Sequence, residues 1–174
     1  MFSIPRNRKT LLFILAIGSP IAFSVWQALL NNFAVEVANF GGKEIGMLQS
    51  LREVPGFLAF TVVFLLLIIR QQNFAILSLI ILGIGTALTG FFPSIIGLYI
   101  TTVTMSIGFH YLETLRSSLS LQWLSKDEAP RLLGKLLSVH SASTLVVLSI
   151  LYIVVFMFEP SYPWLYAIAG FFTV

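Results

Sequence analysis

The stretch from Ser94 to Leu124 limits what this chain can fold into more than any other feature. It is about 31 residues long and mostly apolar. A helix of that length, at about 1.5 Å per residue, is longer than the hydrocarbon core of a bilayer, which is about 30 Å thick. The stretch therefore predicts a tilted, membrane-spanning helix.

Three ionisable residues lie in the middle and second half of this expected helix. His110, Glu113 and Arg116 are spaced at i, i+3 and i+6, so they share one arc of about 120° on the helix surface. Each ionisable side chain costs about 2.5 to 3.5 kcal/mol at the centre of a bilayer. We therefore expect this face to contact protein or a water-filled cavity, with Arg116 and His110 holding Glu113 in place.

The composition indicates an integral membrane protein. Hydrophobic residues make up 57% of the 174 residues and charged residues 10%, and the mean hydropathy is +0.96; soluble domains carry about 25% charged residues. The chain has no cysteine, which excludes disulfides and thiol chemistry. We predict no metal and no cofactor. We also predict no nucleic-acid partner, since a net charge of +3 in a membrane protein mostly reports orientation.

The apolar runs predict an all-α integral membrane protein with six transmembrane helices in one domain, residues 1–174. The expected helices cover residues 11–31, 45–69, 74–92, 94–124, 132–158 and 162–174. The first lacks a convincing cleavage site, so it is interpreted as an uncleaved helix and not a signal peptide. The last provides only about 20 Å of helix, so the chain is expected to stop inside its sixth helix.

The second and fifth expected helices also contain ionisable residues. Arg52 and Glu53 lie in the first third of the second helix, just before Pro55 and Gly56. Proline removes one backbone hydrogen bond, so this position predicts a kink. His140 lies in the first half of the fifth helix.

The apolar runs of the first and third expected helices contain no ionisable residue. The first helix ends in a polar group that includes Gln27 and Asn31. The third carries small residues, which let another helix approach closely; they are Gly83, Gly85, Ala87 and Gly90.

Basic residues are distributed unevenly between the two sides of the predicted bundle. With the N-terminus inside, only Lys43 lies in an outer connection. The inner connections hold Arg6, Arg8, Lys9, Arg70, Lys126, Arg131 and Lys135. This positive-inside bias predicts a cytoplasmic N-terminus, and we expect the plasma membrane, a bacterial inner membrane, as the location.

A short motif, G-x-L-x-S, occurs near the start of both the second and the fifth expected helices. It covers residues 46–50 and 134–138. If helices one to three repeat as helices four to six, the second and fifth are the pair expected to match, and the two copies have opposite orientation. The alignment places Arg52 opposite His140 and Glu53 opposite Ser141.

Six helices, short hairpins and a longer charged loop after the fourth helix resemble the N-terminal half of a major facilitator superfamily (MFS) transporter. Pro130, Arg131 and Gly134 are similar to the family's entry to helix five, whereas the loop between helices two and three offers Arg70 as its only basic residue. The resemblance implies a 3+3 inverted-repeat bundle. It also implies that helices one, two, four and five border a central cavity, with the third and sixth outside.

The candidate residues for a substrate or proton pathway are the polar groups within these helices. They are Glu113, Arg116, His110, Arg52, Glu53, His140, Gln27 and Asn31. Structural roles remain open for several of them. Arg52 and Glu53 could lie near the headgroups, Glu113 and Arg116 could form an i, i+3 salt bridge that only makes the helix tolerable, and His140 could make an interhelical hydrogen bond.

The function predicted from these features is secondary active transport of a small polar solute by alternating access. The partners expected are the solute, a proton, the lipid bilayer, and either a C-terminal six-helix half or a second copy. A non-transporting assembly factor is the alternative. No enzyme activity is predicted, because Ser138 and His140 lie on different faces of one helix and no H-E-x-x-H motif occurs, which disfavours an intramembrane hydrolase.

Overall fold

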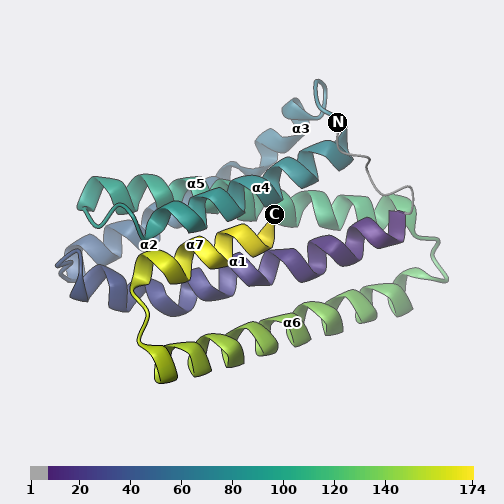
Figure 1. The fold of residues 1–174 in the computed structure, drawn as a ribbon. Helices are drawn as coiled ribbons and strands as arrows, with labels where there is room; N and C mark the ends of the chain where they lie inside the picture. Colours follow the sequence, from purple (N-terminus) through teal and green to yellow (C-terminus); the bar gives the residue numbers. More distant parts are fainter. Residues whose placement is uncertain (1–7) are drawn as a thin grey trace.

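All regular elements are helices in the computed structural model, which describes residues 8–174. They are α1 (Arg8–Glu36), α2 (Gly42–Phe57), the 3-10 helix η1 (Leu58–Thr61), α3 (Val62–Leu65), α4 (Gln71–Thr89), α5 (Ile95–Trp123), α6 (Ala129–Phe158) and α7 (Tyr162–Thr173). The long helices run back and forth along one common direction (Figure 1). The predicted all-α class is confirmed.

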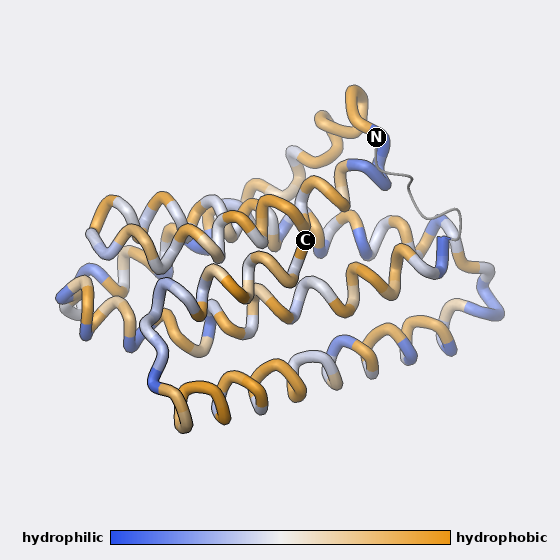
Figure 2. Tube along the Cα trace, viewed as in Figure 1, coloured by the Kyte–Doolittle hydropathy of each residue, from blue (hydrophilic) through white to orange (hydrophobic). Residues whose placement is uncertain are grey.

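Five segments are long and apolar enough to cross a membrane. They are Arg8–Glu36, Gly42–Leu65, Gln71–Thr89, Ile95–Trp123 and Ala129–Phe158. Figure 2 shows that hydrophilic residues concentrate in the turns at the helix ends, with largely hydrophobic helix between them. The sixth predicted helix corresponds to α7, whose 12 residues give about 18 Å of helix and which is not among the five.

The second predicted helix is interrupted. We expected a helix to residue 69, but α2 ends at Phe57, a 3-10 turn follows, and α3 ends at Leu65. Pro55 has no backbone N–H to donate and Gly56 adds backbone freedom, so the regular hydrogen bonds weaken there. The Thr61 hydroxyl donates to the Leu58 carbonyl oxygen at 2.7 Å, which stabilises the tighter turn.

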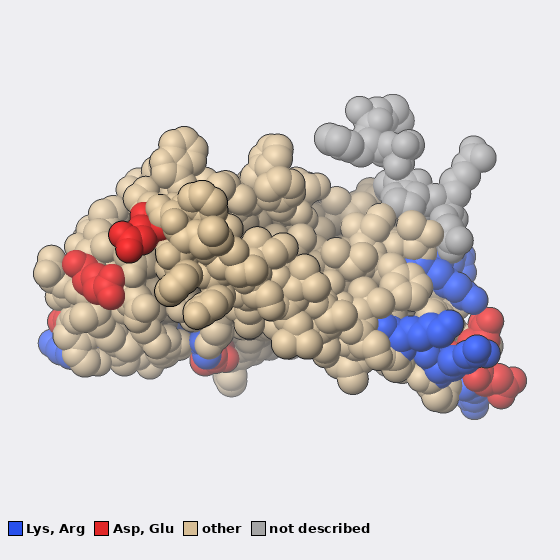
Figure 3. All heavy atoms as spheres, turned by 60° about the horizontal axis from the view of Figure 1, so that its bottom comes forward, with Lys and Arg blue, Asp and Glu red and all other residues tan. Residues whose placement is uncertain are grey.

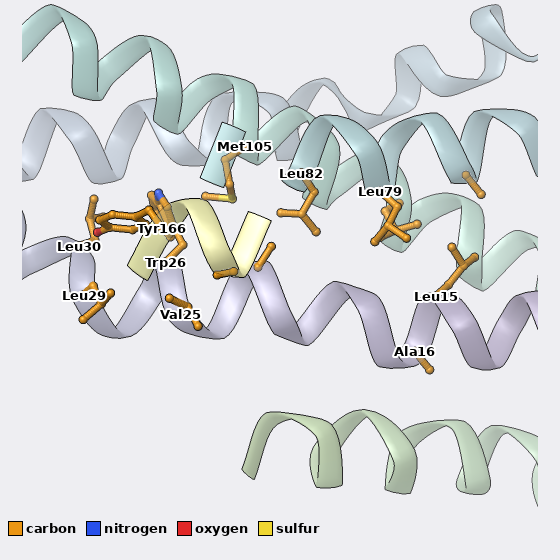
Figure 4. Packing of buried hydrophobic residues seen from close by; sticks show 14 of the residues in the cluster. Leu15, Ala16, Val25, Trp26, Leu29, Leu30, Leu79, Leu82, Met105 and Tyr166 are labelled. Carbon is orange, nitrogen blue, oxygen red and sulfur yellow. The ribbon is translucent and has the colours of Figure 1, made fainter. Parts of the chain in front are cut away.

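The core of the bundle lies between α1, α4, α5 and α7. Figure 4 shows side chains from these helices meeting, among them Leu15, Trp26, Leu82, Met105 and Tyr166. Trp26, Leu82, Met105 and Tyr166 are completely buried. In a membrane, lipid competes equally for apolar surface, so such contacts stabilise the bundle mainly through close van der Waals packing.

Glycines bring helix backbones into direct contact at this core. A Cβ added to Gly83 would lie 2.8 Å from the carbonyl oxygen of Gly170 on α7. A Cβ added to Gly85 would collide with the backbone of Met105 on α5. The prediction that the small residues of this helix allow close approach is therefore confirmed.

Two helical segments lie at the edges of this core. Helix α2 packs along α5, and α6 packs along α1 and only slightly against α5; α6 lies at one side of the bundle in Figure 1. Leu136 is the one buried residue of α6, and Leu48 and Pro55 are the two of α2. Helix α5 thus lies beside two helices, α2 and α6, that bury little of themselves.

Most basic residues gather at one end of the bundle. Figure 3 shows Lys and Arg gathered at one end and acidic residues also at the opposite end, with mostly neutral surface between. We call the first the basic end; among described residues it contains Arg8, Lys9, Arg70, Lys126, Arg131 and Lys135. At this end Lys9 Nζ forms an ion pair with Glu128 Oε1 at 3.2 Å, and Arg8 Cζ lies 5.7 Å from the centroid of the Trp123 ring. Arg6, part of the same prediction, lies outside the described residues.

Candidate functional site

Helix α5 carries two polar clusters, one against each flanking helix. The α2–α5 cluster consists of Arg52, Glu53 and His110, and the α5–α6 cluster consists of Glu113, Arg116 and His140. The three α5 members lie one turn apart along the helix, so a single face of α5 supplies both clusters. Six of the eight predicted site residues are brought together in this way.

In the α2–α5 cluster, the ion pair lies within α2. Arg52 Nη2 lies 2.6 Å and Nε 2.9 Å from Glu53 Oε1, and His110 Nε2 lies 4.0 Å from Glu53 Oε2. The Ser106 hydroxyl donates to the Arg52 carbonyl oxygen. The His110 ring also rests against the α2 backbone, because a Cβ added to Gly56 would lie 2.7 Å from its Cε1.

In the α5–α6 cluster, Arg116 joins two helices. Its Nη2 donates to Glu113 Oε2 at 2.6 Å, and its Nη1 lies 3.4 Å from His140 Nδ1 on α6. Arginine has no acceptor atom, so Nδ1 accepts in this contact and the His140 proton belongs on Nε2. The other carboxylate oxygen, Glu113 Oε1, is buried and has no hydrogen-bond partner.

A groove of about 270 Å³ opens beside this second cluster, between α5 and α6. Its lining residues are Arg116, Ser117, Ser120, Leu133, Leu136, Leu137 and His140. The α5 wall is polar, whereas the α6 wall is formed by three leucines and ends at His140. The groove is therefore amphipathic, with the guanidinium and the imidazole close together.

The structure changes one predicted relationship within the site. We expected both Arg116 and His110 to hold Glu113, but the carboxylate nearest to His110 is Glu53. His110 lies close to the centre of α5, whereas Glu113 lies about 15 Å from the end of α5 at Trp123. The Glu113 carboxylate therefore belongs to the half of the bundle nearer the basic end.

Gln27 and Asn31 do not join either cluster. Both are exposed on α1, and neither side chain makes a hydrogen bond with the described part of the chain. They lie four residues apart, on the same side of α1. Their predicted place in a solute pathway stays a prediction.

Ser117 and Ser120 line the groove but were not among the predicted site residues. Ser117 follows Glu113 by four positions and Ser120 follows Arg116 by four, so they continue the polar face that begins at His110. Extending the i, i+3, i+4 pattern from Glu113 and from Arg116 would have found them. Among residues 8–174 no group of three or more His, Cys, Asp or Glu side chains is arranged to hold a metal ion.

Comparisons with protein-family models, with curated proteins and with solved structures give no match. The structure itself defines the class: a helical bundle with five segments long and apolar enough to cross a membrane.

Proposed function

We propose that this chain is the N-terminal six-helix half of an MFS-type secondary transporter that moves a small polar solute by alternating access. The observation that carries the proposal is the pair of ionisable clusters inside long apolar helices. Charged groups are costly at such positions, and in membrane proteins they commonly mark solute, ion or proton pathways.

The pattern of helix contacts supports a 3+3 inverted repeat. If α1, α2 and α4 correspond to α5, α6 and α7, the contact of α1 with α6 corresponds to that of α5 with α2. In the same way, the contact of α1 with α7 corresponds to that of α5 with α4. Helices α4 and α7 are partners in the proposed repeat, so exchanging them leaves their mutual contact unchanged. Of the three pairs, α1 and α5 match in length, with 29 residues each.

The two copies of the G-x-L-x-S motif have the same local structure, which supports the alignment. Ser50 Oγ donates to the Gly46 carbonyl oxygen, and Ser138 Oγ donates to the Gly134 carbonyl oxygen, both at 2.9 Å. The leucine of each motif is buried against the bundle. The two motifs are therefore alike in the hydrogen bond of their serine and in the burial of their leucine.

The open flanks of the bundle favour a second unit that completes the pathway. Arg52, Glu53 and the groove beside His140 lie on helices that bury little of themselves. In lipid, such polar groups are unfavourable unless protein or water contacts them. We propose that a C-terminal six-helix half or a second copy covers them, with Glu113 or a histidine carrying a coupled proton.

Uptake by purified protein in liposomes tests the proposal. The full-length gene product is reconstituted, and a panel of labelled organic acids, amino acids and sugars is offered with and without an imposed proton gradient. We expect at least one solute class to accumulate, and to accumulate more when protons can enter with it. If no solute moves while the protein co-purifies with a membrane complex, the proposal is wrong and the chain is an assembly factor.

A further inference from the structure

We infer that the groove between α5 and α6 binds the carboxylate of a small, partly apolar organic acid, and that a proton on Glu113 releases Arg116 to hold it. The inference rests on the proposed transport function and names the solute class of that site. It follows from the donors of the groove, from its leucine wall, and from the hydrogen bonds of Arg116.

The polar part of the groove offers mainly hydrogen-bond donors. Arg116 can only donate, and the Nδ1 contact leaves His140 with a donor at Nε2. The Ser117 hydroxyl makes no hydrogen bond with any other described residue, whereas the Ser120 hydroxyl already donates to the Arg116 carbonyl oxygen at 2.8 Å. Convergent donors that include a guanidinium suit an oxyanion, with which charge-assisted hydrogen bonds are strongest.

The opposite wall selects an apolar body. Leu133, Leu136 and Leu137 lie at i, i+3 and i+4 on α6 and face the groove together. A sugar or another polyhydroxylated solute would place hydroxyl groups against these leucines without partners, which is unfavourable. A volume of about 270 Å³ lies just below the usual range for ligand pockets, about 300 to 1,000 Å³, so the ligand is small.

Glu113 and the ligand compete for the same guanidinium. Glu113 Oε2 accepts from Arg116 Nη2 at 2.6 Å, while Glu113 Oε1 is buried without a partner. A proton that binds Oε1 removes the negative charge of Glu113 and leaves Arg116 free to bind a carboxylate. One proton and one carboxylate then enter together, so the net charge of the site does not change.

Arg116 is the charge that dominates the surroundings of Glu113. The other titratable groups near Glu113 are His110 on α5 and His140 on α6. Arg52 and Glu53 on α2 pair with each other, and Glu53 also lies nearest to His110. The apolar runs of α1 and α4 contain no ionisable residue. No other described element thus brings a carboxylate to Arg116 in place of Glu113.

Equilibrium dialysis of the full-length protein in detergent, with labelled hexanoate as the probe, tests the inference. We expect hexanoate to bind more tightly at pH 6 than at pH 8, although it is ionised at both pH values. Hexylamine and hexanol should bind at least tenfold more weakly. Arg116→Gln should weaken hexanoate binding about tenfold or more, because it removes a charge-assisted hydrogen bond.

The decisive variant is Glu113→Gln. It should retain hexanoate binding at pH 8 at least as tightly as the parent protein, and it should abolish the pH dependence. Arg131→Gln is the matched control, because Arg131 is exposed on α6 and does not line the groove; it should leave hexanoate affinity unchanged. Arg116→Lys keeps the charge and should bind hexanoate more tightly than Arg116→Gln, which separates loss of charge from loss of fold.

Three results would overturn the inference. They are loss of binding in Glu113→Gln, equal binding of hexylamine or hexanol, and groove occupancy by phosphatidylglycerol that hexanoate cannot displace. Dialysis needs no transport, so the two proposals fail separately. Uptake of another solute without hexanoate binding contradicts only this inference, whereas absence of uptake for every solute contradicts the transport function.

Discussion

The two clusters on α5 have the same composition, one arginine, one glutamate and one histidine, but they are built differently. In the α2–α5 cluster the ion pair joins adjacent residues of one helix, and the Glu53 side chain is 59% exposed. In the α5–α6 cluster, Arg116 contacts both its own helix and His140 of the next, and the Glu113 side chain is 32% exposed. Both ion pairs lie within one helix, Arg52–Glu53 on α2 and Glu113–Arg116 on α5. The clusters differ in the contact between helices, which the glutamate makes with His110 in the first and the arginine makes with His140 in the second.

This difference assigns the clusters different roles. His110 is held against Gly56, and Ser106 bonds the α2 backbone, so the α2–α5 contact is tightly fixed. Helix α6 packs mainly along α1 and touches α5 only slightly, so a shift of α6 would change the Arg116–His140 contact and the groove together. We therefore expect function to be more sensitive to the α5–α6 cluster.

The largest expected effect is an all-or-none difference in the labelling of introduced cysteines. It shows which side of the membrane each cluster lies nearer to. The chain has no cysteine, so single cysteines can be introduced without further changes. Ser125→Cys at the basic end should react with a membrane-impermeant thiol reagent only after permeabilisation, because basic loops face the cytoplasm. Labelling of Ser125→Cys in intact cells, with Lys43→Cys protected, would reverse the orientation.

The next largest effect is expected from Glu113→Gln. It keeps the shape of the side chain but cannot take up a proton, so proton-driven accumulation should fall at least tenfold while protein abundance stays near that of the parent. Glu53→Gln in the other cluster should change accumulation less than threefold. Liposomes with an imposed pH gradient measure both.

A double substitution tests whether Glu113 and Arg116 have only a structural role. A purely structural ion pair can be replaced by two apolar residues with little loss. If the variant with both Glu113→Leu and Arg116→Leu transports like the parent protein, the α5–α6 cluster has only a structural role. The difference in function assigned to the two clusters would then be wrong.

A smaller effect should show that the α2–α5 cluster is fixed by packing. In Gly56→Ala the new methyl group would push the His110 ring out of its position, at a cost of about 1 kcal/mol for a displaced rotamer. Gly46→Ala on the same helix meets nothing within 4 Å, so it controls for the change in helix propensity. Denaturant unfolding in detergent should give a lower free energy of unfolding for Gly56→Ala than for Gly46→Ala. Equal values would show that the His110 ring is not confined.

The smallest effect is expected at the interrupted segment. Tyr111 and Thr61 share a hydrogen bond of 2.7 Å between α5 and η1. Tyr111→Phe should lower the free energy of unfolding by about 0.5 kcal/mol, the low end for a hydrogen bond, because the Thr61 hydroxyl also donates to Leu58. A change near zero would mean that this bond does not help to hold the segment on α5.

Sequence reasoning located the helices well, because a long apolar run is a strong signal. It also predicted the Glu113–Arg116 pair, since residues three apart on a helix are neighbours. The end of the second helix was less accessible. Pro55 indicated a kink, but the length of the 3-10 turn depends on contacts such as that of Thr61 with Tyr111, which join residues far apart in sequence.

Contacts between helices were the part that the sequence could not supply. Spacing along α5 grouped His110 with Glu113, but the packing of α2 places Glu53 beside His110 instead. The approach of His140 to Arg116 depends on how α6 lies against α1 and α5. Helical periodicity says which residues share a face, but not which helix that face meets.

The contact between Gly83 and Gly170 has a mechanical consequence. Where backbones approach this closely, with only small side chains such as Ala87 nearby, few rotamer changes are available to absorb a displacement. We therefore expect helices α4 and α7 to move together, with little relative displacement at this contact. Helix α6 touches α5 only slightly, so we expect relative movement of the helices to be easiest on the side where Arg116 meets His140.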